Sequence, residues 1–372
     1  MTTDCIESGA AAEPSAKLAD LSLLFGADLD LARQALQLIW NGTGTIDPQL
    51  AHWGLNLGLA VQIEQILAAP QHGVSESLRR KLRFRLSRLA GGRQDLALIL
   101  SPEALAWINA VLEAPNRQPL PLVLDGGIGD HLENLSLLLP WARQQGATLQ
   151  LSCAEPIRVA QLQRLLTQHA GVTLQTQIPA GQVRLPAMAL RVALQQQIPL
   201  ESAVWIHGAP SHQPKRLVCC WRAAGRDDRL SIHLRSLPYG LVQGFYQHLL
   251  SQGWQAEQIV DITAWKDWER SSLQSLGIRQ HNPAEGDVQD LATLVAGAQV
   301  ISIDTALVHL CAAMGQAVQL LLPLFADERW AELLRPGHSY ARWVQVWRQR
   351  RYGDWAEVLS RLARSEAARS CR

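Results

Sequence analysis

The stretch Leu120-Pro-Leu-Val-Leu-Asp-Gly-Gly-Ile-Gly-Asp130 decides the fold of this chain. Its apolar first half predicts a short buried strand, and its glycine-rich second half leads into an amphipathic helix that continues to about Gln145. Gly146 ends that helix, and Thr148 to Cys153 predict the next strand. A strand, a glycine turn, a helix and a second strand within about 30 residues are typical of a βαβ unit with parallel strands.

A second unit of this kind lies far downstream in the sequence. Val300 to Ile303 predict a strand, Asp304-Thr305-Ala306 a tight turn, and Leu307 to Met314 a helix of small residues. Gly315 ends this helix before a strand at Val318 to Leu322. Two more buried strands are expected between the units, at Arg216 to Cys220 and at Gln258 to Ile262. We therefore predict an α/β protein with two doubly wound parallel sheets that face each other across a cleft.

The N-terminal third of the sequence has a helical pattern without a fixed-period repeat. The expected domains are a helical module at 1–116, a Rossmann-like domain at 117–212 and a second Rossmann-like domain at 213–372, joined near Pro210 to Lys215. A helix near Ser75 to Leu89 carries the basic residues Arg79, Arg80, Lys81, Arg83, Arg85 and Arg88. A solvated helix face explains this run, and the alternative is a docking face for an acidic protein partner.

The composition excludes several classes of protein. In 372 residues, 34 Lys and Arg balance 33 Asp and Glu, and this net charge of +1 is not that of a general nucleic-acid binder. A hydrophobic fraction of 48% excludes wholesale disorder. No apolar run reaches the roughly 18 residues of a membrane helix, and the N-terminus shows no signal pattern. The six cysteines form no C-x-x-C pair, so we expect reduced thiols, no metal site and a cytoplasmic protein.

The glycine-rich turn before Asp130 and the tight turn at Asp304-Thr305-Ala306 each connect a predicted strand to a helix. Parallel α/β sheets bind ligands at such carboxyl ends of their strands. Free backbone N–H groups and the helix dipole favour anions there, and phosphate above all. In the first turn, Gly127 and Gly129 permit a close backbone approach to a bound group. Asp130 then begins the helix. It is either a simple helix cap or a carboxylate that acts as general base on an acceptor hydroxyl.

The second turn supplies candidate phosphate ligands. Thr305 offers a hydroxyl and a backbone N–H to a diphosphate, and Ala306 offers another N–H. His309 lies four residues after Thr305 and therefore on the same helix face. It is either a structural residue or part of the site. Arg222 follows a predicted strand, and Arg235 precedes a predicted helix. Two arginines can neutralise a diphosphate without a metal ion.

Several of these motifs resemble those of bacterial heptosyltransferases. Gly127-Ile-Gly-Asp130 resembles their acceptor-side loop, and Arg235-x-x-Pro238 resembles the basic residue before a proline in their phosphate-contacting segment. Val300 to Gly315 resembles their donor motif, although Ala306 replaces a glycine. The chain is more similar still to the glycosyltransferase-like domains found behind tetratricopeptide arrays. These share Leu321-Leu-Pro323, Arg329-Trp330 and Arg348-Gln349-x-x-x-Gly353-Asp354-Trp355.

The resemblance implies a GT-B fold and an inverting, metal-independent glycosyltransferase with a nucleoside-diphosphate sugar as donor and no cofactor. By this similarity Asp130 is the base, Arg235, Thr305 and Ala306 hold the phosphates, and Asp304 contacts the sugar. A C-terminal helix from about Asp354 to Arg364 is expected to pack across the N-terminal half. The resemblance names neither the sugar, of hexosyl or heptosyl type, nor the hydroxyl acceptor.

Two other functions remain open at this stage. One is a catalytically inactive scaffold of the same shape that binds proteins, since a fold alone does not establish an activity. The other is a dinucleotide oxidoreductase, because Gly127-x-Gly129 follows a strand and Glu155 follows the next one. Leu132 stands at the third glycine position of the dinucleotide fingerprint, which disfavours this last possibility.

Overall fold

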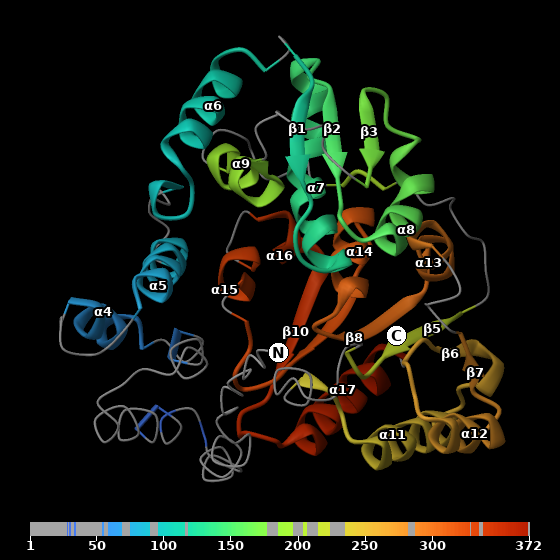
Figure 1. Ribbon diagram of the computed structural model, residues 1–372. Helices are drawn as coiled ribbons and strands as arrows, with labels where there is room; N and C mark the ends of the chain where they lie inside the picture. Colours follow the sequence, from blue (N-terminus) through green and yellow to red (C-terminus); the bar gives the residue numbers. More distant parts are fainter. Residues whose placement is uncertain are drawn as a thin grey trace, which may run out of the picture.

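Figure 1 shows the computed structural model of the chain. The structure describes residues 28, 30, 33–34, 54–55, 59–68, 75–89, 96–115, 118–176, 185–195, 204–206, 215–223, 235–281, 287–327, 329–334 and 338–370. Apart from Lys215, the expected junction between the two Rossmann-like domains lies outside these residues.

The N-terminal α/β unit is built on a four-stranded parallel sheet with the strand order β3-β2-β1-β4. Its strands are β1 (Leu120–Val123), β2 (Leu149–Ser152), β3 (Val172–Gln175) and β4 (Leu185–Pro186). Its helices are α7 (Ile128–Gln145), α8 (Pro156–Leu166) and α9 (Ala187–Leu194). The βαβ unit predicted from the sequence is therefore confirmed as β1, α7 and β2.

The C-terminal α/β unit has a separate six-stranded parallel sheet with the order β10-β9-β8-β5-β6-β7. Its strands are β5 (Leu217–Cys220), β6 (Ile259–Asp261), β7 (Arg279–Gln280), β8 (Gln299–Ile303), β9 (Val318–Leu322) and β10 (Val344–Arg348). Its helical segments are α11 (Tyr239–Ser251), η4 (Ala256–Gln258), α12 (Asp267–Ser275), α13 (Val288–Val295), α14 (Ala306–Met314), α15 (Arg329–Leu333), α16 (Ser339–Trp343) and α17 (Trp355–Ser370). Within the unit, this is the doubly wound 3-2-1-4-5-6 order.

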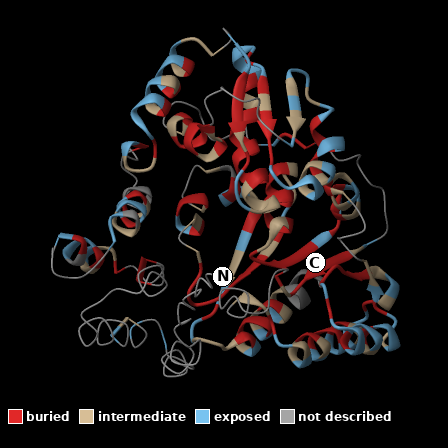
Figure 2. Cartoon of the chain, viewed as in Figure 1, coloured by how far each residue is buried: buried red, intermediate tan, exposed pale blue. Residues whose placement is uncertain are grey.

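The two units touch directly along their helices (Figure 1). Helix α7 packs against α14, and α8 packs against α13. One buried apolar cluster runs through both units and contains, for example, Leu135 of α7 and Leu310 of α14. Figure 2 shows that much of both sheets and of the helices between them is buried. The two expected sheets are thus confirmed, but along α7 and α14 the units share a core where we expected a cleft.

A glycine after each helix explains where α7 and α14 end. Gly146 and Gly315 both adopt the left-handed conformation after their helices, with φ of 64° and 67°. A glycine takes this conformation without a Cβ clash and so ends a helix readily. Both ends lie where the sequence predicted them.

The helices that the structure describes before β1 are α4 (Ala60–Ala68), α5 (Glu76–Leu89), the short 3-10 helix η2 (Leu96–Leu98) and α6 (Pro102–Glu113). Among them, α6 packs against α9 and α5 packs against α15, whereas α4 packs against α5. Ser101 caps α6, since its Oγ accepts a hydrogen bond from Ala104 N at 3.3 Å. Ile108 and Val111 of α6 are buried in the cluster that runs through both units.

Two arginines of the basic helix α5 donate hydrogen bonds to backbone carbonyls of this chain. The Arg79 guanidinium donates to the carbonyl of Leu67, and Arg80 Nε donates to the carbonyl of Leu98 at 2.6 Å. Lys81 and Arg83 are exposed. A protein partner for this helix stays a prediction.

The C-terminal helix α17 begins at the predicted place but packs elsewhere. Trp355, Val358 and Leu362 are buried in a second apolar cluster of the C-terminal unit, together with Val242 and Phe245 of α11. Helix α17 lies beside α11 and β10 (Figure 1). The expectation that this helix packs across the N-terminal half was wrong, because its apolar stripe matches the face of its own sheet.

Two further findings concern the helices and the cysteines. No helix in the described part of the chain is long and apolar enough to cross a membrane. The cysteines at 153, 219, 220 and 311 are buried free thiols, as expected.

Candidate active site

The C-terminal sheet has its topological switch point between β5 and β8. These strands are neighbours, but the chain leaves β5 toward β6 and leaves β8 toward β9. In open α/β sheets, ligands bind beyond the carboxyl ends of the strands at such a point. Asp304 and Thr305 follow β8 here, and Trp221 and Arg222 follow β5.

Helix α14 begins at this point with its first N–H groups uncapped by its own N-cap side chain. Thr305 is the N-cap residue but makes no side-chain cap. Its Oγ1 lies 3.0 Å from Ser302 Oγ and 3.9 Å from Cys220 Sγ, so the hydroxyl faces the sheet edge. The first N–H groups of a helix have no intrahelical partner and attract anions. The Thr305 hydroxyl is directed toward its own sheet, and phosphate binding by Thr305 and Ala306 stays a prediction.

Arg235 lies beside this helix start, as the sequence predicted. Its Nη1 donates to the backbone carbonyl of Asp304 at 3.1 Å and lies 3.8 Å from Asp304 Oδ2. The buried Arg235 Nε has no hydrogen-bond partner among the described residues. One cation, with an unused donor, thus lies next to the turn that begins α14.

Arg222 is engaged in a different contact. Its two terminal nitrogens donate to the Glu269 carboxylate at 3.1 and 3.2 Å, and its guanidinium lies 4.8 Å from the centre of the Trp265 ring. This bidentate pair directs the charge of Arg222 toward α12. A role in phosphate binding stays a prediction.

His309 is fully enclosed behind the helix start. It is 2% exposed, and its Nδ1 lies 3.0 Å from the Tyr340 hydroxyl. The His309 ring stacks on Trp330, with ring centres 5.4 Å apart. Burial lowers the pKa of His309, which keeps the imidazole neutral. These contacts favour the structural interpretation of this residue.

The glycine turn before α7 is closed over by the Asp130 carboxylate. Asp130 Oδ2 accepts a hydrogen bond from Gly127 N at 2.7 Å. Gly126 has a φ of +95°, and a Cβ on it would lie 2.5 Å from Asp130 Oδ2. The turn therefore binds its own carboxylate at the place where a dinucleotide enzyme would bind the pyrophosphate. This disfavours the oxidoreductase interpretation.

The starts of α7 and α14 are in contact across the two units. A Cβ on Gly129 would lie 2.9 Å from His309 Cδ2 and 3.4 Å from Ala306 Cα. The absence of a side chain at Gly129 lets the two helices approach so closely. Asp130 and the Asp304–Ala306 turn thus lie at the same junction.

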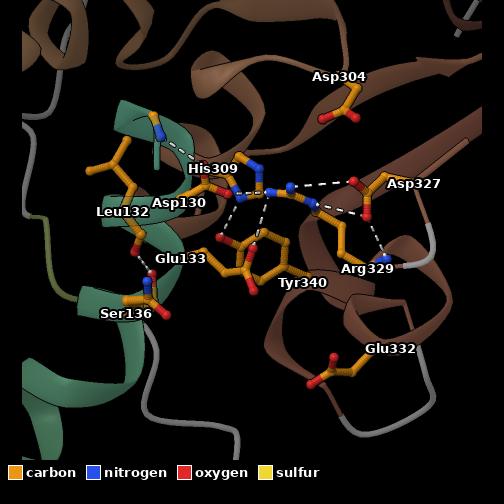
Figure 3. A network of polar contacts seen from close by, with 12 residues as sticks. Asp130, Leu132, Glu133, Ser136, Asp304, His309, Asp327, Arg329, Glu332 and Tyr340 are labelled. Carbon is orange, nitrogen blue, oxygen red and sulfur yellow. Dashed lines mark hydrogen bonds and ion pairs between the residues drawn. The ribbon is translucent and has the colours of Figure 1, made fainter. Parts of the chain in front are cut away.

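Arg329 is the residue of this junction to which the sequence analysis assigned no role. It begins α15 and reaches across to α7, where its Nη1 lies 2.6 Å from Asp130 Oδ1 and 3.6 Å from Glu133 Oε2 (Figure 3). On its own unit it pairs with Asp327 at 3.2 Å. The only available signal was Arg329-Trp330 in the resemblance, because 199 residues separate Arg329 from Asp130.

The described residues contain no group of three or more His, Cys, Asp or Glu side chains placed to hold a metal ion.

Comparisons with known proteins give two distant likenesses. No protein-family model and no curated protein match the sequence significantly. The structure of Escherichia coli ADP-heptose lipopolysaccharide heptosyltransferase II is similar, with 13% sequence identity and a TM-score of 0.44, over 66% of this chain and 99% of that chain. The E. coli heptosyltransferase WaaC with ADP is similar at 13% identity and a TM-score of 0.42, over 67% of this chain and all of that chain.

Proposed function

We propose that this chain is an inverting glycosyltransferase that transfers a sugar from a nucleoside diphosphate to a hydroxyl acceptor, without a metal ion or cofactor. One observation carries the proposal. A carboxylate at the start of α7, Asp130, lies at the same junction as the uncapped start of α14, which has Arg235 beside it. A base and an anion site on opposite sides of one junction are what this reaction requires.

The reaction proceeds in one displacement. The Asp130 carboxylate takes the proton of the acceptor hydroxyl, whose oxygen attacks the anomeric carbon of the sugar from the face opposite the diphosphate. The bond from that carbon to the diphosphate oxygen breaks, and the diphosphate leaves with the electron pair. The backbone N–H of Ala306 and the Arg235 guanidinium stabilise the charge that develops on it. Asp304, which is 8% exposed, is proposed to contact the sugar.

The test is calorimetric titration of UDP, GDP and ADP into the full chain in the presence of EDTA. We expect binding of at least one of the three at micromolar to millimolar concentration. Failure of all three at millimolar concentration would contradict the proposal.

A second candidate is a scaffold of the same shape without activity. The contacts of Asp130 favour this alternative, since both oxygens of its carboxylate already accept hydrogen bonds, from Gly127 and Arg329. Under this alternative a nucleotide diphosphate binds without turnover, and Asp130→Asn changes stability alone.

A further inference from the structure

Arg329 lies among carboxylates of both units. Its side chain is 24% exposed and pairs with Asp130 and Glu133 of α7 and with Asp327 of its own loop. Burial alone would lower the pKa of Arg329, but the charges of Asp327, Glu133 and Asp130 raise it well above its usual value. The guanidinium is therefore a permanent cation at the junction.

Arg329 and Gly127 together bind both oxygens of Asp130. Gly127 N donates to Oδ2 at 2.7 Å, and Arg329 Nη1 donates to Oδ1 at 2.6 Å (Figure 3). One donor comes from the N-terminal unit and the other from the C-terminal unit. Because the two bonds hold opposite sides of the carboxylate, they define its plane as well as its position.

The planar fork of Arg329 is used on two sides at once. While Nη1 faces α7, Nη2 donates to Asp327 Oδ2 at 3.3 Å, and Nε lies 3.2 Å from Asp327 Oδ1 as an ion pair without a hydrogen bond. Asp327 thus orients the guanidinium that orients Asp130. A lysine carries the same charge but lacks this fork, so it can reach Asp130 without being oriented by Asp327.

The C-terminal sequence block holds the loop that carries Arg329. Gln349 Oε1 accepts hydrogen bonds from Leu324 N at 3.1 Å and Gly353 N at 3.4 Å, and Arg348 Nη2 donates to the Leu324 carbonyl at 2.6 Å. The loop after β9 is therefore tied, at Leu324, to the end of β10 and the residue after it. The residues of the Arg348-Gln349-x-x-x-Gly353 pattern therefore hold this loop by hydrogen bonds.

We propose that Arg329 is a positioning residue that holds the Asp130 carboxylate toward the acceptor, and that the block from Arg348 to Gly353 holds Arg329 in place. This inference rests on the proposed function, in which Asp130 is the base. It makes the geometry of the base in one unit depend on a loop of the other.

The test compares Arg329→Met and Arg329→Lys with Arg164→Met in the full chain. Arg164 is a matched control, since it also joins the units, with Asp287 Oδ1 at 3.0 Å, but it lies on α8. The first readout is hydrogen exchange of the Gly127 amide, which does not require activity. We expect about tenfold faster exchange in Arg329→Met, because the carboxylate that accepts this N–H is released, and no change in Arg164→Met.

The second readout is the release of nucleoside diphosphate from UDP-glucose, GDP-mannose and ADP-glucose, with water as acceptor. We expect kcat to fall about 100-fold in Arg329→Met with nearly unchanged KM for the donor, since a misplaced base does not alter donor binding. Arg329→Lys should recover part of kcat, and Arg164→Met should match the wild-type chain.

Each outcome decides one claim. Equal Gly127 exchange in Arg329→Met and Arg164→Met overturns the positioning role. So does unchanged kcat in an Arg329→Met chain that releases the diphosphate. If the wild-type chain neither binds nor releases a nucleoside diphosphate, the proposed function is wrong. In that case Gly127 exchange still decides whether Arg329 holds Asp130.

Discussion

Arg329 Nη1 and Asp130 Oδ1 form an ion pair of 2.6 Å that joins the first turn of α15 to the first turn of α7. The pair connects the two α/β units, each of which has its own parallel sheet. It lies where the start of α14 meets the start of α7. The candidate base and the candidate donor site are therefore parts of one contact between the units.

Replacement of the proposed base should abolish turnover and spare donor binding. We expect Asp130→Asn to lower the transfer rate by about 10²–10⁴-fold, because a general base acts in the transition state, while the nucleotide Kd changes little. The measurement is steady-state transfer with parallel calorimetry.

The control for that variant is Asp290→Asn. Asp290 is the third residue of α13 and accepts a hydrogen bond from Asp287 N at 3.3 Å, so it has the same capping role as Asp130. Equal loss of rate in the two variants would show that Asp130 only caps its helix.

Contact between the units should depend on the missing side chain at Gly129. A Cβ there would lie 2.9 Å from His309 Cδ2, so Gly129→Ala forces α7 away from α14. We expect the free energy of unfolding to fall by about 1–3 kcal/mol. Urea denaturation measures this change.

Gly244→Ala is the matched control, because a Cβ on Gly244 within α11 meets no atom within 4 Å. It should leave the stability unchanged or raise it by up to about 1 kcal/mol. A Gly129→Ala chain as stable as Gly244→Ala would contradict the close contact of the two helices.

Stability should fall on acidification through His131. Its side chain is fully buried, and burial with the nearby charge of Arg158 lowers the pKa of His131 from 6.5 to about 4. The unfolded chain then binds more protons between these values, so His131 contributes stability above pH 6.5 that is lost as the pH falls toward 4.

Between pH 7 and pH 5 this loss amounts to about 2 kcal/mol. His131→Leu should therefore reduce the drop in unfolding free energy over that interval, whereas the same replacement at the exposed His248 should not. Identical pH dependence in the wild-type and His131→Leu chains would disprove the contribution.

Local patterns were sufficient to predict most of the fold. The apolar runs of β1, β2, β8 and β9 and the glycines at 146 and 315 placed both βαβ units to within a residue or two. Strands β3, β4, β7 and β10 were not predicted, and β4 (Leu185–Pro186) and β7 (Arg279–Gln280) are too short to show a pattern. The destination of α17 was missed because an apolar stripe states that a helix packs but not against which sheet.

The candidate site was only partly predictable for a related reason. Turns at strand ends pointed to Asp130, Asp304 and Arg235, since local sequence shows where a helix begins after a strand. The partner of Asp130 comes from 199 residues away, and the direction of the Thr305 hydroxyl is set by Ser302 and Cys220. The first of these contacts depends on how the two units meet, and the contact of Thr305 with Cys220 depends on the pairing of β8 with β5 within one sheet, so no local spacing records either.

The affinity of the chain for a nucleoside diphosphate, with and without Arg235, tests the central claim most directly. The measurement is titration of UDP, GDP and ADP in EDTA into the wild-type chain, Arg235→Ala and the control Arg279→Ala, which removes an exposed arginine from β7. We predict that Arg235→Ala raises the Kd of the bound nucleotide about 10- to 100-fold, as expected for a lost hydrogen bond to a charged group, and that Arg279→Ala does not. Equal affinity of all three chains, or no binding by the wild-type chain, would contradict the account.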